Sequence, residues 1–258
     1  MPSLPFFTLP AGRRLAILSA LVDEQRGLIE HLEDRQKVEH AGRHFWLGQL
    51  DGVPVVLTVS RIGKVSAATT ATVLAERFEA GAIVFTGVAG GLAPGVNVGD
   101  VVVAQDFLQH DLDVSPLFPR YEVPAYGRSR FACHAGLSQA LSEAVEDCLA
   151  GGLDGRMHRG LVASGDRFVC GAQESAELRA RLQTAGHEAL AVEMEGAAVA
   201  QVCADHGLAF AAMRTISDRA DDQAHQDFAD FVQTVARVYA ERIMRGLLAR
   251  LAGAASAG

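Results

Sequence analysis

The sequence has few cysteines, a single tryptophan and no long apolar run, and these shortages exclude whole classes of protein. Its four cysteines are far apart, with no C-x-x-C pair and no neighbouring histidine at ligand spacing. The sequence therefore indicates neither a disulfide framework nor a zinc site. No apolar run approaches the roughly 20 residues that a bilayer-spanning helix needs. We interpret the cysteines as buried, reduced thiols and expect a cytoplasmic protein.

Runs of basic residues are also missing. The chain has 23 Lys and Arg against 31 Asp and Glu, a formal net charge of −8, which disfavours binding to nucleic acid or to a membrane surface. Arg13 and Arg14 precede an apolar stretch at 15–22, as in a signal peptide. That stretch is short and runs into charged residues without a clear small-residue cleavage site. We interpret it as a buried first strand.

What the sequence does contain is an alternation of strand-like and helix-like segments. With 258 residues, of which 49% are apolar, the chain can bury roughly 70–75% of its unfolded surface as one large domain. The alternation predicts an α/β fold. The predicted strands are 15–20, 45–50, 53–59, 82–86, 98–105, 161–164, 189–192 and 208–216. The predicted helices are 22–32, 66–78, 137–149, 175–184, 195–206 and 228–251.

One turn signal and the chain ends complete this prediction. Asp51 and Gly52 are a hairpin signal between two of the strands. We expect a flexible N-terminal extension over 1–12, one domain over 13–251 and a disordered tail over 252–258.

A glycine-rich segment, Thr86–Gly91, follows a predicted strand. Glycines at such a place suit either a tight turn or a close approach of the backbone to a ligand, and the spacing does not choose between these two. The segment is not G-x-G-x-x-G, and Gly63 with Lys64 lacks the rest of a P-loop. Binding of a nucleoside triphosphate is therefore not supported.

Acidic residues follow three of the predicted strands. Glu24 comes just after the first, Glu193 and Glu195 follow the strand at 189–192, and Asp218 follows the strand at 208–216. In open α/β sheets the carboxyl ends of the strands face the ligand crevice. Each acid alone is readily explained as a helix cap or as a favourable charge in a first helical turn. Acids at three separate strand ends together favour an active site.

Six sequence blocks, in the same order, resemble the bacterial 5′-methylthioadenosine/S-adenosylhomocysteine nucleosidases. The blocks are Ser60–Val65, Thr86–Leu92, Val98–Val103, Ser164–Phe168, Val192–Ala197 and Arg214–Asp218. The ordered set is typical of the wider purine nucleoside phosphorylase/nucleosidase superfamily and spans most of residues 13–250. The resemblance implies a twisted mixed β-sheet surrounded by helices and a homodimer. It also implies hydrolysis of an N-glycosidic bond that releases adenine, with no metal or redox cofactor.

The resemblance gives the acids separate catalytic roles. Asp218 matches the residue that protonates N7 of the purine, so that adenine leaves as a neutral molecule, and Ser217 would orient it. Glu24 matches the group that activates the attacking water, and Arg214 stands beside that water site. Val88 occupies a position where many relatives have serine, which removes a hydroxyl near the water. Such a reaction needs one carboxyl group protonated and the other ionised.

Other residues match the family's substrate contacts. Glu195 would hold the ribose hydroxyls, with Met194 along the sugar. Phe168 would stack on the base, and the backbone of Val169 would bind its edge. The remaining expected substrate contacts are Ala89, Gly90, Ile62, Val114 and Phe228. The 5′ substituent stays open among methylthio, homocysteinyl, deoxy and aminofutalosine groups.

Two alternatives to the nucleosidase remain. A nucleoside phosphorylase would use phosphate as nucleophile, but the segment at Gly87 lacks the preceding arginine that phosphorylases commonly have there. A noncatalytic nucleoside-binding protein could keep the same fold, because fold alone does not set function. Release of adenine with and without phosphate separates the three hypotheses.

Overall fold

The fold is a mixed β-sheet covered by helices. The computed structural model describes residues 7–220, 231 and 235–256. The strands are β1 (Arg14–Ser19), β2 (Glu33–His40), β3 (Arg43–Leu50), β4 (Val53–Val59), β5 (Ala80–Gly91), β6 (Val101–Gln109), β7 (Arg130–Ala132), β8 (Met157–Ser164), β9 (Ala189–Glu193) and β10 (Ala209–Asp218). The helices are α1 (Val22–Glu30), α2 (Lys64–Glu76), α3 (Ala135–Ala150), α4 (Ala172–Thr184), α5 (Gly196–His206) and α7 (Arg237–Ser256). Among the described residues, no helix is long and apolar enough to cross a membrane.

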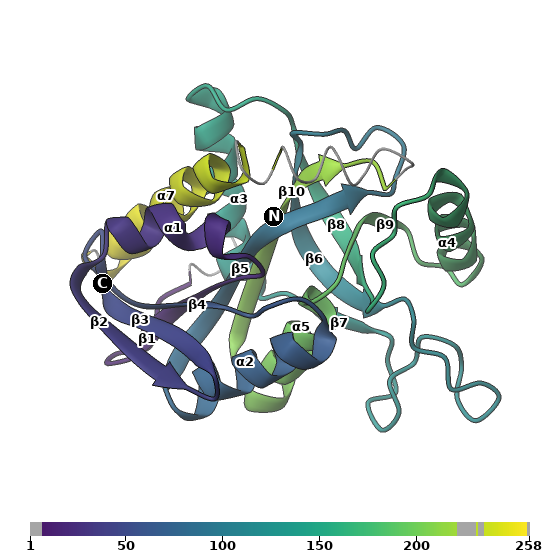
Figure 1. Ribbon diagram of the computed structural model, residues 1–258, viewed down its shortest axis with the longest axis horizontal. Coiled ribbons are helices and arrows are strands. Elements are labelled where there is room, and N and C mark those ends of the chain that lie inside the picture. Colours follow the sequence, from purple (N-terminus) through teal and green to yellow (C-terminus); the bar gives the residue numbers. More distant parts are fainter. Residues whose placement is uncertain (1–6, 221–230, 232–234, 257–258) are drawn as a thin grey trace.

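Five of the strands close into a ring. The order β10-β6-β8-β9-β5 is completed by a further pairing of β10 with β5. Strands β1, β4, β3 and β2 continue outward from β5, on the side of the molecule opposite to α4 (Figure 1). Parallel and antiparallel pairs are both present, since β5 runs parallel to β1 and β10 but antiparallel to β9. The expected single-domain α/β fold with a mixed sheet is confirmed.

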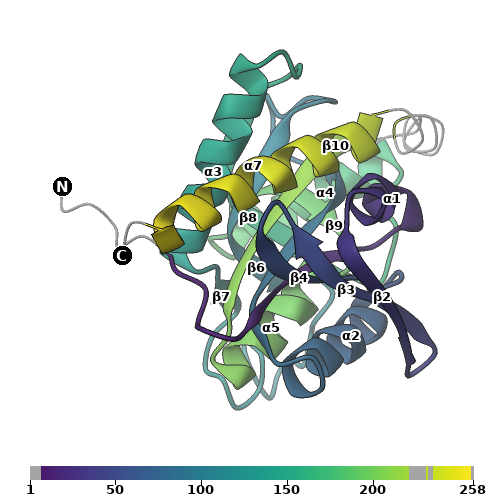
Figure 2. The ribbon, with the colours of Figure 1, turned by 90° about the vertical axis from the view of Figure 1, so that its left-hand side faces the viewer.

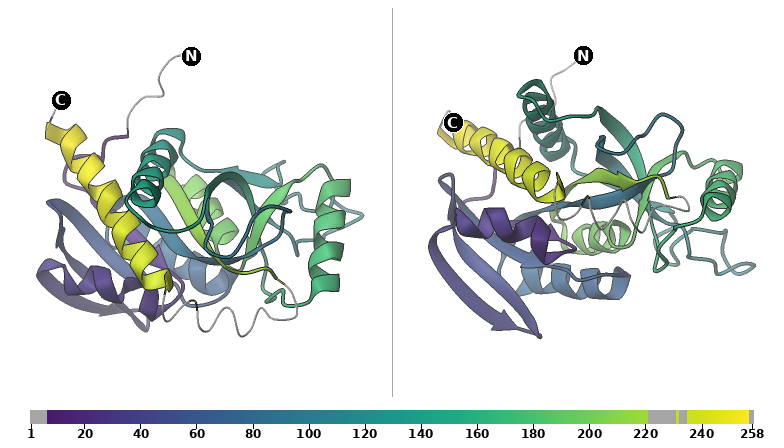
Figure 3. Two further views of the ribbon diagram at one scale, coloured as in Figure 1. Left: turned by 90° about the horizontal axis from the view of Figure 1, so that it is seen from above. Right: turned by 45° about the horizontal axis from the view of Figure 1, so that its top comes forward.

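The central strands are buried because helices cover both of their faces. In β1, Ala16 and Leu18 face the core under α2 and α5, whereas Leu15 and Ile17 face the core under α1, α3 and α7. Figure 2 shows α7 lying between α3 and α1, and Figure 3 shows these helices and α2 on opposite sides of the sheet. This explains why the inner strands read as continuous apolar runs.

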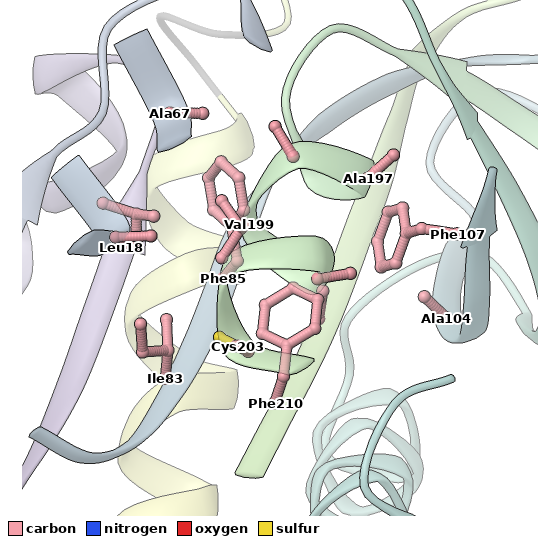
Figure 4. Packing of buried hydrophobic residues seen from close by; sticks show 14 of the residues in the cluster. Leu18, Ala67, Ile83, Phe85, Ala104, Phe107, Ala197, Val199, Cys203 and Phe210 are labelled. Atoms are coloured by element: carbon pink, nitrogen blue, oxygen red, sulfur yellow. The ribbon is translucent and has the colours of Figure 1, made fainter. Parts of the chain in front are cut away.

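The core under α5 contains several aromatic side chains. Figure 4 shows Phe85 of β5 and Phe210 of β10 beside Val199 and Cys203 of α5. Phe107 packs against Phe210, with ring centroids 5.7 Å apart. Burying each such side chain contributes about 1.5–3 kcal/mol. This core fixes the strand ends that carry the site.

Two strands, β2 and the three-residue β7, and one helix extension were not predicted from the sequence. The sequence of β2 is almost entirely charged or polar: β2 pairs only with β3, and Val38 is its one side chain packed against the core. A charged edge strand of this kind discourages pairing with other molecules. Helix α7 continues to Ser256, past the predicted helix end at residue 251. The hairpin at Asp51 and Gly52 is confirmed, with positive φ of 49° and 80°.

The glycine-rich segment belongs to β5 and forms neither a tight turn nor a loop. There Gly90 pairs with both Val192 of β9 and Asp218 of β10, so a third strand joins the ladder where the sequence suggested a break. Glycines inside strands permit such close backbone approach. A Cβ atom at Gly90 would lie 2.9 Å from Asp218 Oδ1 and 3.0 Å from Ala220 Cβ.

The expected domain boundaries stay a prediction. Within the expected N-terminal extension, Phe7 is buried and its ring packs against the ring of His134, with centroids 5.3 Å apart. The chain is therefore packed onto the domain at this residue.

Candidate active site

A cavity of about 350 Å³ lies where six strands end. Its lining residues all come at, or just after, the carboxyl ends of strands β1, β4, β5, β8, β9 and β10. They are Ala20, Leu21, Ile62, Val88, Ala89, Gly90, Arg167, Phe168, Val169, Val192, Glu193, Met194, Glu195, Ser217 and Asp218. The cavity is therefore at the edge where α/β sheets bind ligands.

Asp218 ends β10 and is held at both carboxyl oxygens. The Ser217 hydroxyl donates a hydrogen bond to Oδ2 at 2.8 Å, and the Ala220 N–H donates to Oδ1 at 2.8 Å. The residue is buried, and it borders the cavity. The Ser217 hydroxyl thus contacts the Asp218 carboxyl group directly. These bonds fix the direction in which the carboxyl group faces the cavity.

Glu24 lies in the first turn of α1 and is buried rather than solvated. The N–H groups of Ala20 and Leu21 donate to Oε2 at 3.0 and 2.9 Å, an arrangement that caps the helix. Oε1 has no partner in hydrogen-bond geometry among the described residues. A Cβ atom placed on Gly87 would lie 3.5 Å from this Oε1, so this oxygen faces the backbone of β5.

The burial of Glu24 changes its acidity. It raises the pKa of Glu24 from the ordinary 4.5 to about 7, against the lowering effects of the Leu21 N–H and of the positive charge on Arg214. A carboxyl group with this pKa is ionised in a large fraction of molecules near neutral pH and still basic enough to accept a proton.

A buried ion pair lies beside Glu24. Arg214 Nη2 donates to Glu193 Oε2 at 2.7 Å, and both side chains are almost fully buried. Glu193 also accepts hydrogen bonds from the Gly196 N–H and, at short range, from the Ser164 hydroxyl. Glu193 therefore joins β8, β9, the start of α5 and β10.

Glu195 directly precedes α5 and borders the cavity. Its Oε1 accepts a hydrogen bond from the Gly63 N–H at 2.9 Å. Burial and the neighbouring Glu193 charge raise the pKa of Glu195 to about 8. A carboxyl group held in this way can accept hydrogen bonds from vicinal hydroxyls of a sugar or donate one to them.

Most of the sequence-predicted site residues meet around this cavity. Met194, Phe168, Val169, Ile62, Ala89 and Gly90 all border it, together with Glu195, Ser217 and Asp218. Glu24 and Arg214 are buried next to it and are not among its lining residues. Phe228 lies outside the described residues. Val114 lies in the segment between β6 and β7 and is not among the lining residues either.

Sequence reasoning assigned no function to the two charged lining residues Glu193 and Arg167. The sequence shows Glu193 only as an acid at a strand end. Its bonds to Arg214 and Ser164 form only when β8, β9 and β10 come together in the fold. Arg167 directly precedes Phe168, and its Nε lies 2.7 Å from Glu174 Oε1. In the sequence, the position of Arg167 directly before Phe168 was the only indication that it lies at the site. In the described parts of the chain, no group of three or more His, Cys, Asp or Glu is placed to hold a metal ion.

Comparisons with known proteins agree with this geometry. Residues 14–249 match the family model of the Phosphorylase superfamily. A 5′-methylthioadenosine/S-adenosylhomocysteine nucleosidase from Neisseria meningitidis, solved with methylthio-immucillin-A, is 33% identical with a TM-score of 0.84, covering 93% of this chain and 100% of that one. The chain therefore belongs to the phosphorylase superfamily.

Two further solved structures are similar along nearly their whole length. A nucleosidase of the same name from Colwellia psychrerythraea, in complex with adenine, is 33% identical with a TM-score of 0.85, covering 96% of this chain and 98% of that one. The enzyme from S. pneumoniae, with a transition-state inhibitor, is 31% identical with a TM-score of 0.83, covering 92% and 99%. The resemblance found in the sequence blocks, to the nucleosidase branch of the superfamily, is confirmed.

Proposed function

We propose that this chain hydrolyses the N-glycosidic bond of nucleosides of the 5′-methylthioadenosine and S-adenosylhomocysteine type and releases adenine. The observation that carries the proposal is the meeting of three carboxyl groups, Asp218, Glu195 and Glu24, at or beside one cavity. They reach it from the ends of β10, β9 and β1. The similarity to solved nucleosidases that hold adenine or a nucleoside analogue supports the same reaction.

The reaction assigns each group one proton-transfer or binding task. Asp218 gives its proton to N7 of the purine while the electron pair of the C1′–N9 bond passes to the base. The oxygen of a water molecule forms the new bond to C1′, and Glu24 accepts the proton that this water loses. Glu195 holds the ribose hydroxyls, and Phe168 packs on the base. Adenine and the free sugar are the products, and solvent restores both carboxyl groups to their starting states.

The cavity wall favours water over phosphate as the nucleophile. Phosphate binding calls for cations and hydroxyl donors. Among the described lining residues Arg167 is the one cation; its side chain is 75% exposed and already paired with Glu174. Arg214 is committed to Glu193. A phosphate dianion would therefore lack an unpaired cationic partner in this part of the site.

We also propose a homodimer that works in the cytoplasm. Leu117 is 83% exposed and Val65 is 78% exposed, and a second copy that covered these side chains would remove their apolar surface from water. The segment that contains Val114 and Leu117 would then be covered by a second copy. The four cysteines are free thiols, as expected in a reducing compartment.

The direct test is incubation of the purified chain with 5′-methylthioadenosine and identification of products by mass spectrometry. We expect adenine and 5-methylthioribose in equal amounts. Binding of the nucleoside without release of adenine would instead support the noncatalytic nucleoside-binding protein.

A further inference from the structure

Three buried carboxyl groups surround a single buried cation. Glu24, Glu193 and Glu195 are 1%, 6% and 5% exposed, and Arg214 is 1% exposed. Among the described residues, Arg214 is the one buried lysine or arginine. In a low-dielectric environment, the carboxylate that holds this guanidinium decides how much positive charge the other two experience.

Among the described residues, Glu193 is the one carboxylate that the Arg214 guanidinium bonds to. Its Nη2 and Nε both donate to Glu193 Oε2, at 2.7 and 3.3 Å. Its Nη1 donates to the backbone carbonyls of Phe85 and Met213 at 3.1 and 2.9 Å. Its Cζ atom lies 4.1 Å from the centroid of the Phe85 ring. None of these bonds goes to Glu24.

Glu24 is nevertheless close to this cation. A Cβ atom on Gly87 would lie 3.5 Å from Glu24 Oε1 and 3.7 Å from Arg214 Cζ, so both groups converge on the same point of β5. Without Glu193, the guanidinium would keep its full charge beside Glu24. A nearby opposite charge favours the ionised carboxylate and makes it a weaker base.

We propose that Glu193 is a positioning residue of the hydrolytic reaction: it holds Arg214 and neutralises its charge, and so leaves Glu24 basic enough to accept the proton of the attacking water. The inference rests on the proposed function and adds a residue to it. In this account Glu193 acts through Arg214, whereas Glu24 contacts the water itself. The raised pKa of Glu24 agrees with it, because Arg214 contributes to that pKa less than burial does.

A purely structural role for Glu193 is the competing explanation. Glu193 accepts N–H bonds from Glu195 at 3.2 Å and from Gly196 at 3.0 Å, at the start of α5. Glutamine keeps the size of the side chain and one acceptor oxygen, so Glu193→Gln removes mainly the charge. Glu193→Asp keeps the charge and shortens the side chain. The two variants therefore separate charge from packing.

Other charged groups lie near Glu24 and Glu193 on several elements. Glu195 faces it from the start of α5, and His110 faces Glu193 from the segment after β6. On α1 itself Asp23 pairs with Arg26 at 3.2 Å. From α7, Glu241 and Arg237 contact α1 at Gly27, on a later turn than Glu24. Removing the Glu193 charge also removes a repulsion on Glu195, so the pKa of Glu195 falls in the same direction as that of Glu24.

The test measures the pKa of Glu24 in two ways. In chains with ¹³C-labelled glutamate, NMR titration follows the Glu24 carboxyl carbon, assigned by its loss in Glu24→Gln. In parallel, kcat/KM for 5′-methylthioadenosine is measured between pH 5 and 9. We expect Glu193→Gln to lower both the NMR midpoint and the acidic limb of kcat/KM by about 1 pH unit or more. We also expect kcat at pH 8 to fall about 10-fold or more, with a small change in KM.

Controls make the outcome decisive. Glu193→Asp should keep the wild-type pH midpoint even if its rate falls. Asp100→Asn removes another buried carboxylate, which accepts bonds from Asn97 and Arg156, and should leave the midpoint unchanged. Unchanged midpoints in Glu193→Gln, together with a lower melting temperature, would overturn the inference. An inactive wild-type chain would refute the proposed function alone, because the NMR titration still tests the charge of Arg214.

Discussion

Replacing Glu24 by glutamine should stabilise the protein while stopping the reaction. Burial raises the pKa of Glu24 to about 7 from 4.5. Above neutral pH, the ionised Glu24 side chain is therefore less stable in the folded chain than in the unfolded chain. Glutamine is uncharged, has nearly the same size and offers an oxygen to the Ala20 and Leu21 N–H groups. The same substitution removes the group that accepts the proton of water. Stability gained at the expense of activity is expected for strained active-site groups.

The magnitude follows from the pKa difference and depends on pH. Each pKa unit corresponds to about 1.4 kcal/mol, so ionised Glu24 costs the folded state about 3 kcal/mol. Because the folded pKa lies above the unfolded value, this cost is absent below about pH 4.5. It grows as pH rises through 7 and is complete above that. Glu24→Gln should therefore gain little at pH 4.5 and about 3 kcal/mol at pH 8.5.

Urea unfolding at several pH values measures this gain. Asp100→Asn is the matched control, and we expect it to change the free energy of unfolding in the opposite direction. Burial of Asp100 raises its pKa, but the Asn97 N–H, His158 and the Arg156 N–H outweigh burial and lower the pKa below its ordinary value. Neutralising Asp100 should therefore destabilise the chain at pH 8.5. If the gain of Glu24→Gln is the same at pH 4.5 and 8.5, or is absent at both, the reasoning about Glu24 is refuted.

Three further predictions concern the acid, the 5′ end and a glycine. Asp218→Asn should lower single-turnover release of adenine by about 10²–10⁴-fold while a nonhydrolysable nucleoside analogue still binds; a near-normal rate would leave Asp218 as a helix cap only. The kcat/KM for methylthioadenosine should exceed that for AMP, because the one lining cation, Arg167, is paired with Glu174 among the described residues, and burying a phosphate without a partner is costly. Comparable values for the two would contradict this. Gly90→Ala should cost about 1–3 kcal/mol in urea unfolding and lower the rate, since its Cβ would lie 2.9 Å from Asp218 Oδ1. Gly253→Ala, in α7 and with no atom within 4 Å of its Cβ, is the control and should not destabilise the chain.

Most of the fold could be predicted from apolar patterns. The strands buried on both faces, such as β1 and β4, give continuous apolar runs, and the helices that cover them give helical spacing. The edge strand β2 was not predicted because it contributes only Val38 to the core and therefore carries no apolar pattern. That the glycine-rich segment forms the end of β5 was not predicted for another reason. Its pairing with β9 joins segments about 100 residues apart, and local sequence carries no signal for such a contact.

Some features of the site could likewise be predicted from the sequence, and others could not. The acids at strand ends could be named from their positions after apolar runs, and Glu195 and Asp218 do border one cavity. The burial of Glu24 and the commitment of Arg214 to Glu193 depend on β1, β5, β9 and β10 lying side by side. A single sequence shows the charges but not which of them meet. Which of the three carboxylates binds the Arg214 guanidinium is therefore knowable only from the folded chain.

The central claim is that water, and not phosphate, attacks the sugar. We would follow adenine release from 5′-methylthioadenosine in phosphate-free buffer and across a phosphate titration, and identify the sugar product by NMR. The account predicts one rate throughout the titration, with free 5-methylthioribose as the sugar product. A rate that vanishes without phosphate, with 5-methylthioribose 1-phosphate as product, would contradict it and establish a phosphorylase.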